Sequence, residues 1–150
     1  MFHILTSALV LTTLLAPASF AGQGDKKEKG KKPDRTIEIV RENGKIVFRE
    51  KDKPKGQGKP RAVAVVVGET VRWVNRDTES HTLKSVAKVG GKPVFDTQAI
   101  KPGEHKDVVF NIDMYRGVGG LPAQYVTLKY RGGDKADQEG ELTFLSAARR

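Results

Sequence analysis

The sequence predicts an all-β fold, an antiparallel sandwich or barrel. Two short segments, Thr36–Val40 and Lys45–Phe48, alternate apolar with polar residues, which is the pattern of strands with one buried face. Asn43 and Gly44 stand between them, and this pair accepts the positive φ angles of a tight hairpin turn. No stretch longer than a turn or two has the periodicity of a helix.

Further strands are expected in order along the chain. Ala62–Val67 is a continuous apolar run rich in β-branched residues, which indicates a strand buried on both sides. In Thr70–Val74, Val71 and Trp73 share one face, so Trp73, the only tryptophan, is expected in the core. Turns with Gly or Pro separate the remaining predicted strands, which are His81–Val86, His105–Phe110, Tyr125–Tyr130 and Glu141–Leu145.

The N-terminal residues have the composition of an export signal. Residues 1–21 contain no Lys, Arg, Asp or Glu, and Ile4–Leu15 is an apolar stretch too short to span a bilayer. The small residues Ser19 and Ala21 then precede a highly charged run. We therefore expect a signal peptide over 1–21, cleaved near Ala21, and a periplasmic or secreted protein with no transmembrane segment after cleavage. An uncleaved N-terminal anchor is the alternative.

The net charge is +9, and much of it is gathered in residues 25–35 and 51–61. Neither run has an apolar residue to bury, so both are expected to be solvated. They could attract an anionic surface or an acidic partner, or act only as soluble tethers. Because the chain is expected to be exported, nucleic acid is not expected as a partner. The predicted parts are a basic flexible tail over 22–35, one folded domain over 36–146 and a C-terminal tail over 147–150.

Two segments far apart in the chain carry a family resemblance. Gly68–Asp77 reads GETVRWVNRD and leads to His81, and Tyr130–Gly140 reads YRGGDKADQEG. Together with the turn Pro102-Gly103-Glu104, these segments resemble the amicyanin- and plastocyanin-like cupredoxins, the small blue copper proteins. The resemblance covers about residues 36–146 and implies a Greek-key β-sandwich of about seven to eight strands.

The resemblance also implies which positions would bind copper. The ligand loop of the family reads Tyr-x-Cys-x-x-His-x-x-Met-x-Gly, and His81 matches the histidine ligand that precedes this loop. Gly132 stands at the Cys position, Lys135 at the second His position and Gln138 at the Met position. A blue copper site needs a thiolate, and this chain has no cysteine. We therefore expect a degenerate type-1 copper site in which Gly132, Lys135 and Gln138 bind no metal.

His105 is the other histidine of the predicted mature chain. If the strand that begins there pairs antiparallel with Tyr125–Tyr130, His105 falls near Gly132, at the end where the resemblance places His81. His81 and His105 could then bind Cu(II) or Zn(II) as a non-blue site. Carboxylates that could help are Glu104, Asp134 and Asp137. The alternative is a vestigial His81, hydrogen-bonded inside the sandwich, with His105 on an exposed turn.

The connection between Phe110 and Tyr125 is longer than the family's. It contains three residues that look exposed, Met114, Tyr115 and Leu121. The segment is either a contact surface or a loop packed by its own side chains.

The sequence therefore predicts a secreted cupredoxin-like domain that acts as a binding or structural module rather than as an electron carrier. No enzyme is expected, because no nucleophile lies in a recognisable motif. Under this interpretation there is no cofactor, and the partner is an unknown protein or an anionic surface. One alternative is a non-blue copper or zinc binding protein, or copper carrier, that uses His81 with His105. Another is a protein whose basic tail anchors it to an anionic surface.

The export signal and the tail can be tested by mass spectrometry. The intact mass of the exported protein is expected to correspond to a chain that begins near Gly22. Limited trypsin digestion is expected to trim it to about Thr36 without unfolding the domain, because nothing apolar fixes the tail. A mass that retains residues 1–21 contradicts cleavage, and a protected tail means that it docks on the domain or on a partner.

Overall fold

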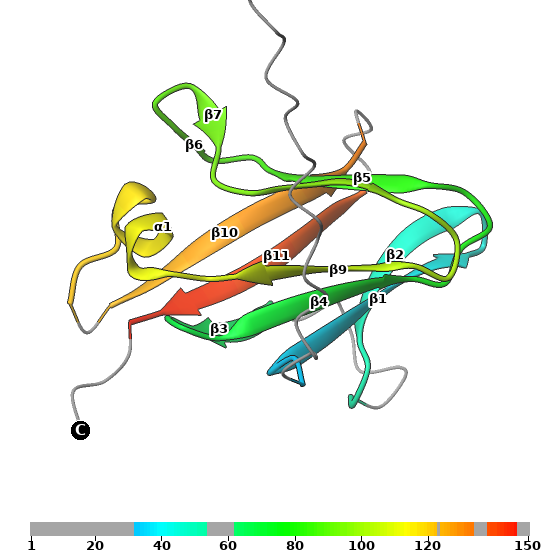
Figure 1. Ribbon diagram of the computed structural model, residues 1–150, viewed down its shortest axis with the longest axis horizontal. Coiled ribbons are helices and arrows are strands. Elements are labelled where there is room, and N and C mark those ends of the chain that lie inside the picture. The colour runs from blue at the N-terminus through cyan, green and yellow to red at the C-terminus, as the bar shows by residue number, and fades with distance from the viewer. Residues whose placement is uncertain (1–31, 54–61, 123, 134–137, 147–150) are drawn as a thin grey trace, which may run out of the picture. The chain divides into compact units, whose positions relative to one another are not determined.

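A computed structural model describes residues 32–53, 62–122, 124–133 and 138–146. These residues belong to one compact unit, Lys32–Arg150, which contains two sheets with a shared core. The first sheet has the order β2-β1-β4-β9, with β1 at Arg35–Glu42, β2 at Lys45–Glu50, β4 at Thr70–Asn75 and β9 at His105–Val109. The second has the order β3-β11-β10-β5-β8, with β3 at Val63–Val66, β11 at Glu139–Leu145, β10 at Tyr125–Gly132, β5 at His81–Ser85 and β8 at Asp96–Ile100. The predicted β-sandwich is confirmed (Figure 1).

Three short elements lie outside the two sheets. They are β6 at Lys88–Val89, β7 at Lys92–Pro93 and the helix α1 at Ile112–Gly117. The ribbon of β6 and β7 packs against α1, since a Cβ on Gly117 would lie 2.8 Å from Cγ2 of Val89 (Figure 1). No helix within the described ranges is long and apolar enough to cross a membrane.

The first hairpin forms as the sequence predicts. Asn43 and Gly44 have φ angles of 49° and 78°, and the turn joins β1 to β2 in antiparallel register. Asp34 accepts a hydrogen bond from the amide of Thr70 at 2.8 Å, and Arg35 is the first residue of β1. β1 therefore begins one residue before the boundary predicted at residue 36. The predicted signal peptide over 1–21 and the C-terminal tail over 147–150 lie outside the described residues.

Trp73 is the centre of the core, as predicted. Its side chain is fully buried, and its ring lies 5.2 Å from Phe95, 5.7 Å from Tyr130 and 6.2 Å from Phe110, measured between ring centroids. Such aromatic pairs each contribute about 0.5–1.5 kcal/mol beyond the burial of their area. Because Trp73 belongs to the first sheet and Tyr130 to the second, the cluster fastens the two sheets together.

Two details of the strand prediction were wrong. β3 is an edge strand whose Ala64 is exposed, so the run Ala62–Val67 is not buried on both sides. β8 was not predicted, and with it the two sheets contain nine strands in the described residues rather than seven to eight. The bulge in β8 hides the alternation: its buried residues Thr97 and Ile100 are three positions apart, and Gln98 between them has a φ of 57°.

The predicted pairing of the strand that begins at His105 was also wrong. β9 pairs antiparallel with β4, so that His105 lies opposite Val74 in the first sheet. β10 has no free side for β9, because β11 and β5 occupy both of its edges.

The long connection before β10 is packed by its own side chains. Tyr115 in α1 is buried rather than exposed, and its hydroxyl lies within hydrogen-bond distance of the carbonyl oxygens of Leu121 and Gln124. Asn111 caps the helix by accepting a hydrogen bond from the amide of Met114, which is itself partly buried. Leu121 is exposed, as expected.

Tyr130 and Gly140 lie directly opposite each other in the β10–β11 pair. A Cβ on Gly140 would lie 2.2 Å from Cζ of Tyr130, so the tyrosine ring covers the space that a side chain would need. This contact explains physically why a tyrosine and a glycine occur together at the two ends of the segment Tyr130–Gly140.

We expect Gly140→Ala to lower the free energy of unfolding by about 1–3 kcal/mol, because the methyl group overpacks the core. Urea denaturation measures this loss. In the Tyr130→Leu background the same change is expected to cost much less, since the ring that it meets is gone. Equal costs in the two backgrounds would show that Tyr130 does not limit position 140.

Candidate functional site

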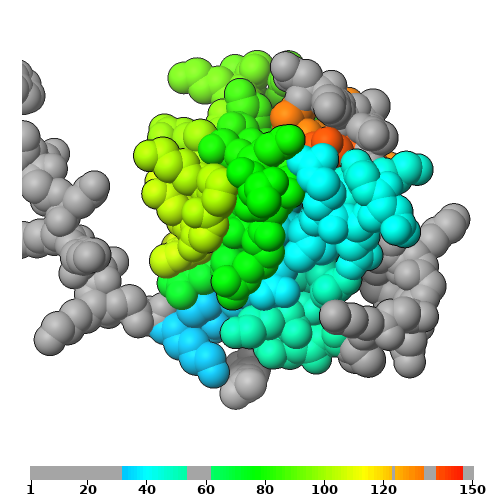
Figure 2. All heavy atoms as spheres, turned by 90° about the vertical axis from the view of Figure 1, so that its right-hand side faces the viewer, coloured from blue at the N-terminus to red at the C-terminus, as the bar shows by residue number. Residues whose placement is uncertain are grey.

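His81 is the first residue of β5. The connection from β4 that leads to it lies at the end of the sandwich that faces the viewer in Figure 2. The green connection between β4 and β5 lies there between the cyan β1–β2 hairpin and the yellow-green β8–β9 turn. His81 is only 7% exposed, so its ring is part of the folded interior at this end.

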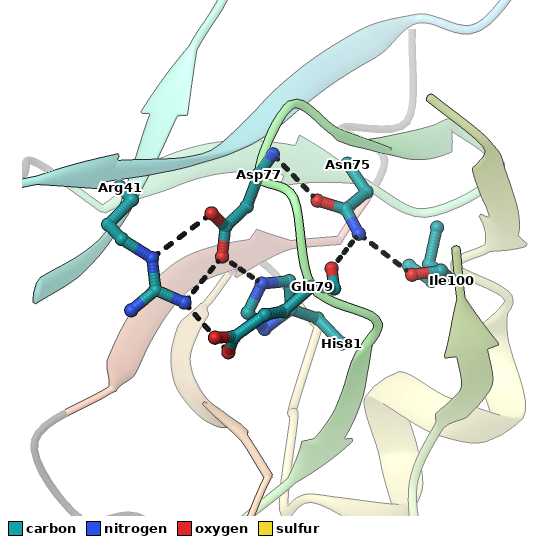
Figure 3. Close-up of polar contacts among 6 residues, drawn as sticks. All are labelled: Arg41, Asn75, Asp77, Glu79, His81 and Ile100. Atoms are coloured by element: carbon teal, nitrogen blue, oxygen red, sulfur yellow. Dashed lines mark hydrogen bonds and ion pairs between the residues drawn. The ribbon is translucent and has the colours of Figure 1, made fainter. Parts of the chain in front are cut away.

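Asn75, the last residue of β4, shapes the connection that leads to His81. Its side-chain amide donates to the carbonyl oxygens of Glu79 at 2.7 Å and Ile100 at 2.8 Å. Its side-chain oxygen accepts from the amide of Asp77 at 2.9 Å (Figure 3). The buried side chain of Asn75 thus fixes the conformation of the connection and links it to β8. Both polar atoms of this side chain have hydrogen-bond partners.

Asp77 joins His81 to the first sheet. Its Oδ2 lies 2.7 Å from Nε2 of His81, and its carboxylate also accepts two hydrogen bonds from Arg41 on β1, at 3.1 and 2.8 Å (Figure 3). Arg41 makes a second ion pair with Glu79 at 2.8 Å. The carboxylate therefore bridges a cation of one sheet and a histidine of the other, in a forked geometry that favours strong charge-assisted bonds.

The charge on Asp77 determines which ring nitrogen of His81 carries a hydrogen. The hydrogen bond from Arg41 holds the pKa of Asp77 well below its usual range; burial opposes this, and the His81 bond adds to it. An ionised carboxylate can only accept, so Nε2 of His81 is the donor. Nδ1 of His81 has no hydrogen-bond partner among the described residues.

Gly132, at the position of the family's cysteine, is buried. A Cβ there would lie 3.0 Å from Oε1 of Gln138 and 3.4 Å from Cζ of Phe48. The Gly132 amide also donates to the Gln138 carbonyl at 2.8 Å. The left-handed φ of 68° belongs to the next residue, Gly133, rather than to Gly132. Gln138 therefore fills the space beside Gly132, and Lys135 lies outside the described residues.

His105 lies on the other sheet, exposed at the start of β9. Among the carboxylates expected to help, Glu104 accepts a hydrogen bond from the amide of Lys101, and Asp134 and Asp137 lie outside the described residues. Within the described ranges, no group of three or more His, Cys, Asp or Glu side chains is arranged to hold a metal ion. The metal site formed by His81 and His105 stays a prediction. The strand pairing from which it was inferred does not occur, because β9 pairs with β4.

Sequence reasoning found His81 but missed the residues that hold it. Asp77 precedes His81 by four positions, a spacing that could have drawn attention to it. Arg41 lies 36 residues before Asp77, on a strand of the other sheet, and only the three-dimensional fold brings the two together.

We expect Asp77→Asn to be less stable at pH 7 by about 1–3 kcal/mol, because it loses charge-assisted hydrogen bonds. The folded-state pKa of Asp77 lies below the unfolded value of about 3.9, so its stabilisation is complete above that pH and is lost as pH falls toward the folded pKa. Below about pH 4, the free energy of unfolding measured with urea should therefore fall less steeply with decreasing pH in the variant than in the parent. The difference in slope is expected to be up to about 1.4 kcal/mol per pH unit. Glu141→Gln, which changes an exposed carboxylate of β11, is the control. Equal slopes for Asp77→Asn and the parent would contradict the lowered pKa.

Comparison with solved structures gives matches to forms of amicyanin and to a cupredoxin. A methionine-to-alanine mutant of amicyanin in its Cu(I) form matches with a TM-score of 0.50 and 18% identity, over 77% of this chain and 86% of that chain. A proline-to-glycine mutant of amicyanin, reduced, matches with the same values. A purple cupredoxin from Nitrosopumilus maritimus has a TM-score of 0.46 and 22% identity, over 74% of this chain and 99% of that chain.

No family model matches the sequence, and no curated protein matches it. At 18% identity the likeness to the two amicyanin structures is one of fold. The strand order, the core around Trp73 and the two amicyanin matches agree with one another. The chain therefore has a cupredoxin-like fold.

Proposed function

We propose that this chain is an exported cupredoxin-like domain that works as a binding or structural module and not as a blue-copper electron carrier. Periplasmic or extracellular location is part of the proposal, and it rests on the composition of residues 1–21. We propose no catalytic activity, because the sequence has no nucleophile in a recognisable motif.

The observation that carries the proposal is the environment of Gly132. Type-1 copper requires a cysteine thiolate close to the plane of two histidine nitrogens, and the chain has no cysteine at all. At the position that the resemblance assigns to this ligand, Gln138 and Phe48 pack against Gly132. The residues present do not fit a blue copper ion.

The contacts of His81 support a structural role for this end of the domain. Asp77 and Arg41 hold the histidine in place through bonds that link β5 to β1. Charge-assisted hydrogen bonds to one buried carboxylate fix the positions of the elements that they connect. A rigid end with fixed loops is a suitable platform for a partner.

A non-blue metal site is the second candidate function, and one observation favours it. A carboxylate that orients a histidine through its far nitrogen is common behind metal-bound histidines, and Asp77 does this to His81. Nδ1 would then be the atom available to Cu(II) or Zn(II), with His105 as the other ligand of this hypothesis. His105 lies on the opposite sheet, which weakens the hypothesis.

Anchoring by the basic tail remains a further alternative. The net charge of +9 favours attraction to an anionic surface. Most of the predicted tail lies outside the described residues, so this alternative rests on the sequence alone.

Titration of the protein with Cu(II) tests the proposal. We expect no intense visible band, since no thiolate can bind the metal, and no binding at micromolar copper by calorimetry. If the second candidate function holds, copper binds without the blue band, and His81→Ala and His105→Ala each weaken it by about tenfold or more. Lys106→Ala, beside His105 on β9, is the matched control. A blue band would overturn the proposal.

A further inference from the structure

A hollow of about 310 Å³ lies on the outer side of the second sheet, where β5 passes into β6 beside β10. Three of its lining side chains are cationic, and none is acidic. The lining residues are Lys84, Ser85, Val86, Lys88, Arg131 and Gly133. The hollow therefore presents concentrated positive charge to a ligand.

Two of these cations face each other directly. Lys84 and Arg131 are paired residues of the antiparallel strands β5 and β10, and both side chains are exposed. Like charges at directly opposite positions destabilise a sheet, because the two side chains stand side by side on one face. An anion bound between them would remove this repulsion.

Among the described residues, the carboxylates that pair with Lys84 and Arg131 lie on the two outer strands of this row. Asp96 on β8 pairs with Lys84 at 3.3 Å, and Glu139 on β11 pairs with Arg131 at 3.2 Å. Across the neighbouring strands β8, β5, β10 and β11 the row therefore reads acid, base, base, acid. Glu139 is shared with Lys129 at 2.9 Å. Ion pairs this exposed are weak, so they leave the two central cations available.

Lys88 adds a third charge with no ion-pair partner in the described part of the chain. The hydroxyl of Ser85 is already used, because it donates to the carbonyl of Ala87 and accepts from the amide of Val94. Recognition in the hollow therefore depends on Lys84, Lys88 and Arg131.

We propose that this hollow binds an oxyanion of the phosphate or sulfate type. A guanidinium offers two parallel donors to such a group, and lysines add mobile point charges. The volume is at the lower end of the range for ligand pockets, which suits a single anionic group better than a large ligand. The same group could come as a free ion or as the headgroup of an anionic lipid. This inference deepens the proposed binding role and rests on it.

Phosphate titration of the full chain tests the site. At constant ionic strength, phosphate in place of chloride is expected to raise the melting temperature, because a ligand that binds only the folded state stabilises it. The amide signals of residues 84–88 and 131–133 should shift together in NMR spectra. We expect Arg131→Gln to weaken phosphate binding by about tenfold. Lys45→Gln, which removes an exposed lysine of β2 in the other sheet, should change it by less than about twofold.

Vesicles distinguish the two sources of the anion. Binding of the full chain to phosphatidylglycerol vesicles is measured, with phosphatidylcholine vesicles as the reference. The double variant Lys88→Gln/Arg131→Gln is compared with a control double variant that loses the same charge, Lys45→Gln/Lys106→Gln. A selective loss in the first pair identifies a lipid headgroup, whereas an effect on free phosphate alone identifies the ion. Equal behaviour of the two pairs in both assays overturns the site. That result leaves the copper titration untouched, so the two proposals fail separately.

Discussion

The contact between Trp73 and the aromatic rings around it is the constraint on which the rest of this domain depends. The chain has no cysteine, so no disulfide fastens the sheets, and the interior has to do so alone. Trp73 meets Phe95 and Tyr130 from the opposite side of the sandwich, and Phe110 extends the cluster to Phe144 at a centroid distance of 5.3 Å. The two sheets are therefore held at a fixed separation, and this fixes where the loops at their ends emerge.

The loops at the His81 end depend on this separation. Arg41 belongs to one sheet and His81 to the other, and Asp77 can reach both only when the sheets are packed. Packing and polar order are thus coupled: loss of the core would separate the partners of Asp77 and leave its carboxylate unpaired. The low pKa of Asp77 is the electrostatic signature of this coupling.

Local signals in the sequence were enough for much of the fold and for little of the site. The turn at Asn43-Gly44, the inward Trp73 and the sandwich itself follow from alternation and turn chemistry. β8 escaped prediction because its bulge replaces a two-residue alternation by a three-residue spacing. The partner of β9 escaped because pairing is decided by which edges are free, which no local pattern reports. His81 was identified from the sequence segment that contains it. Arg41 could not be identified in this way, because only the folded structure brings it to Asp77.

The bulge in β8 affects whether copies of this protein can pair through their sheet edges. β8 is an edge of the second sheet, and a flat edge offers a row of free backbone groups to a strand from another molecule. Here Gln98 turns through a left-handed conformation, and the side chains of Asp96 and Thr97 bond its amide and its carbonyl oxygen. The backbone along this edge is therefore out of step with any regular incoming strand. A domain without disulfides, which opens more readily than a cross-linked one, is thereby protected at this edge from growing into a continuous intermolecular sheet.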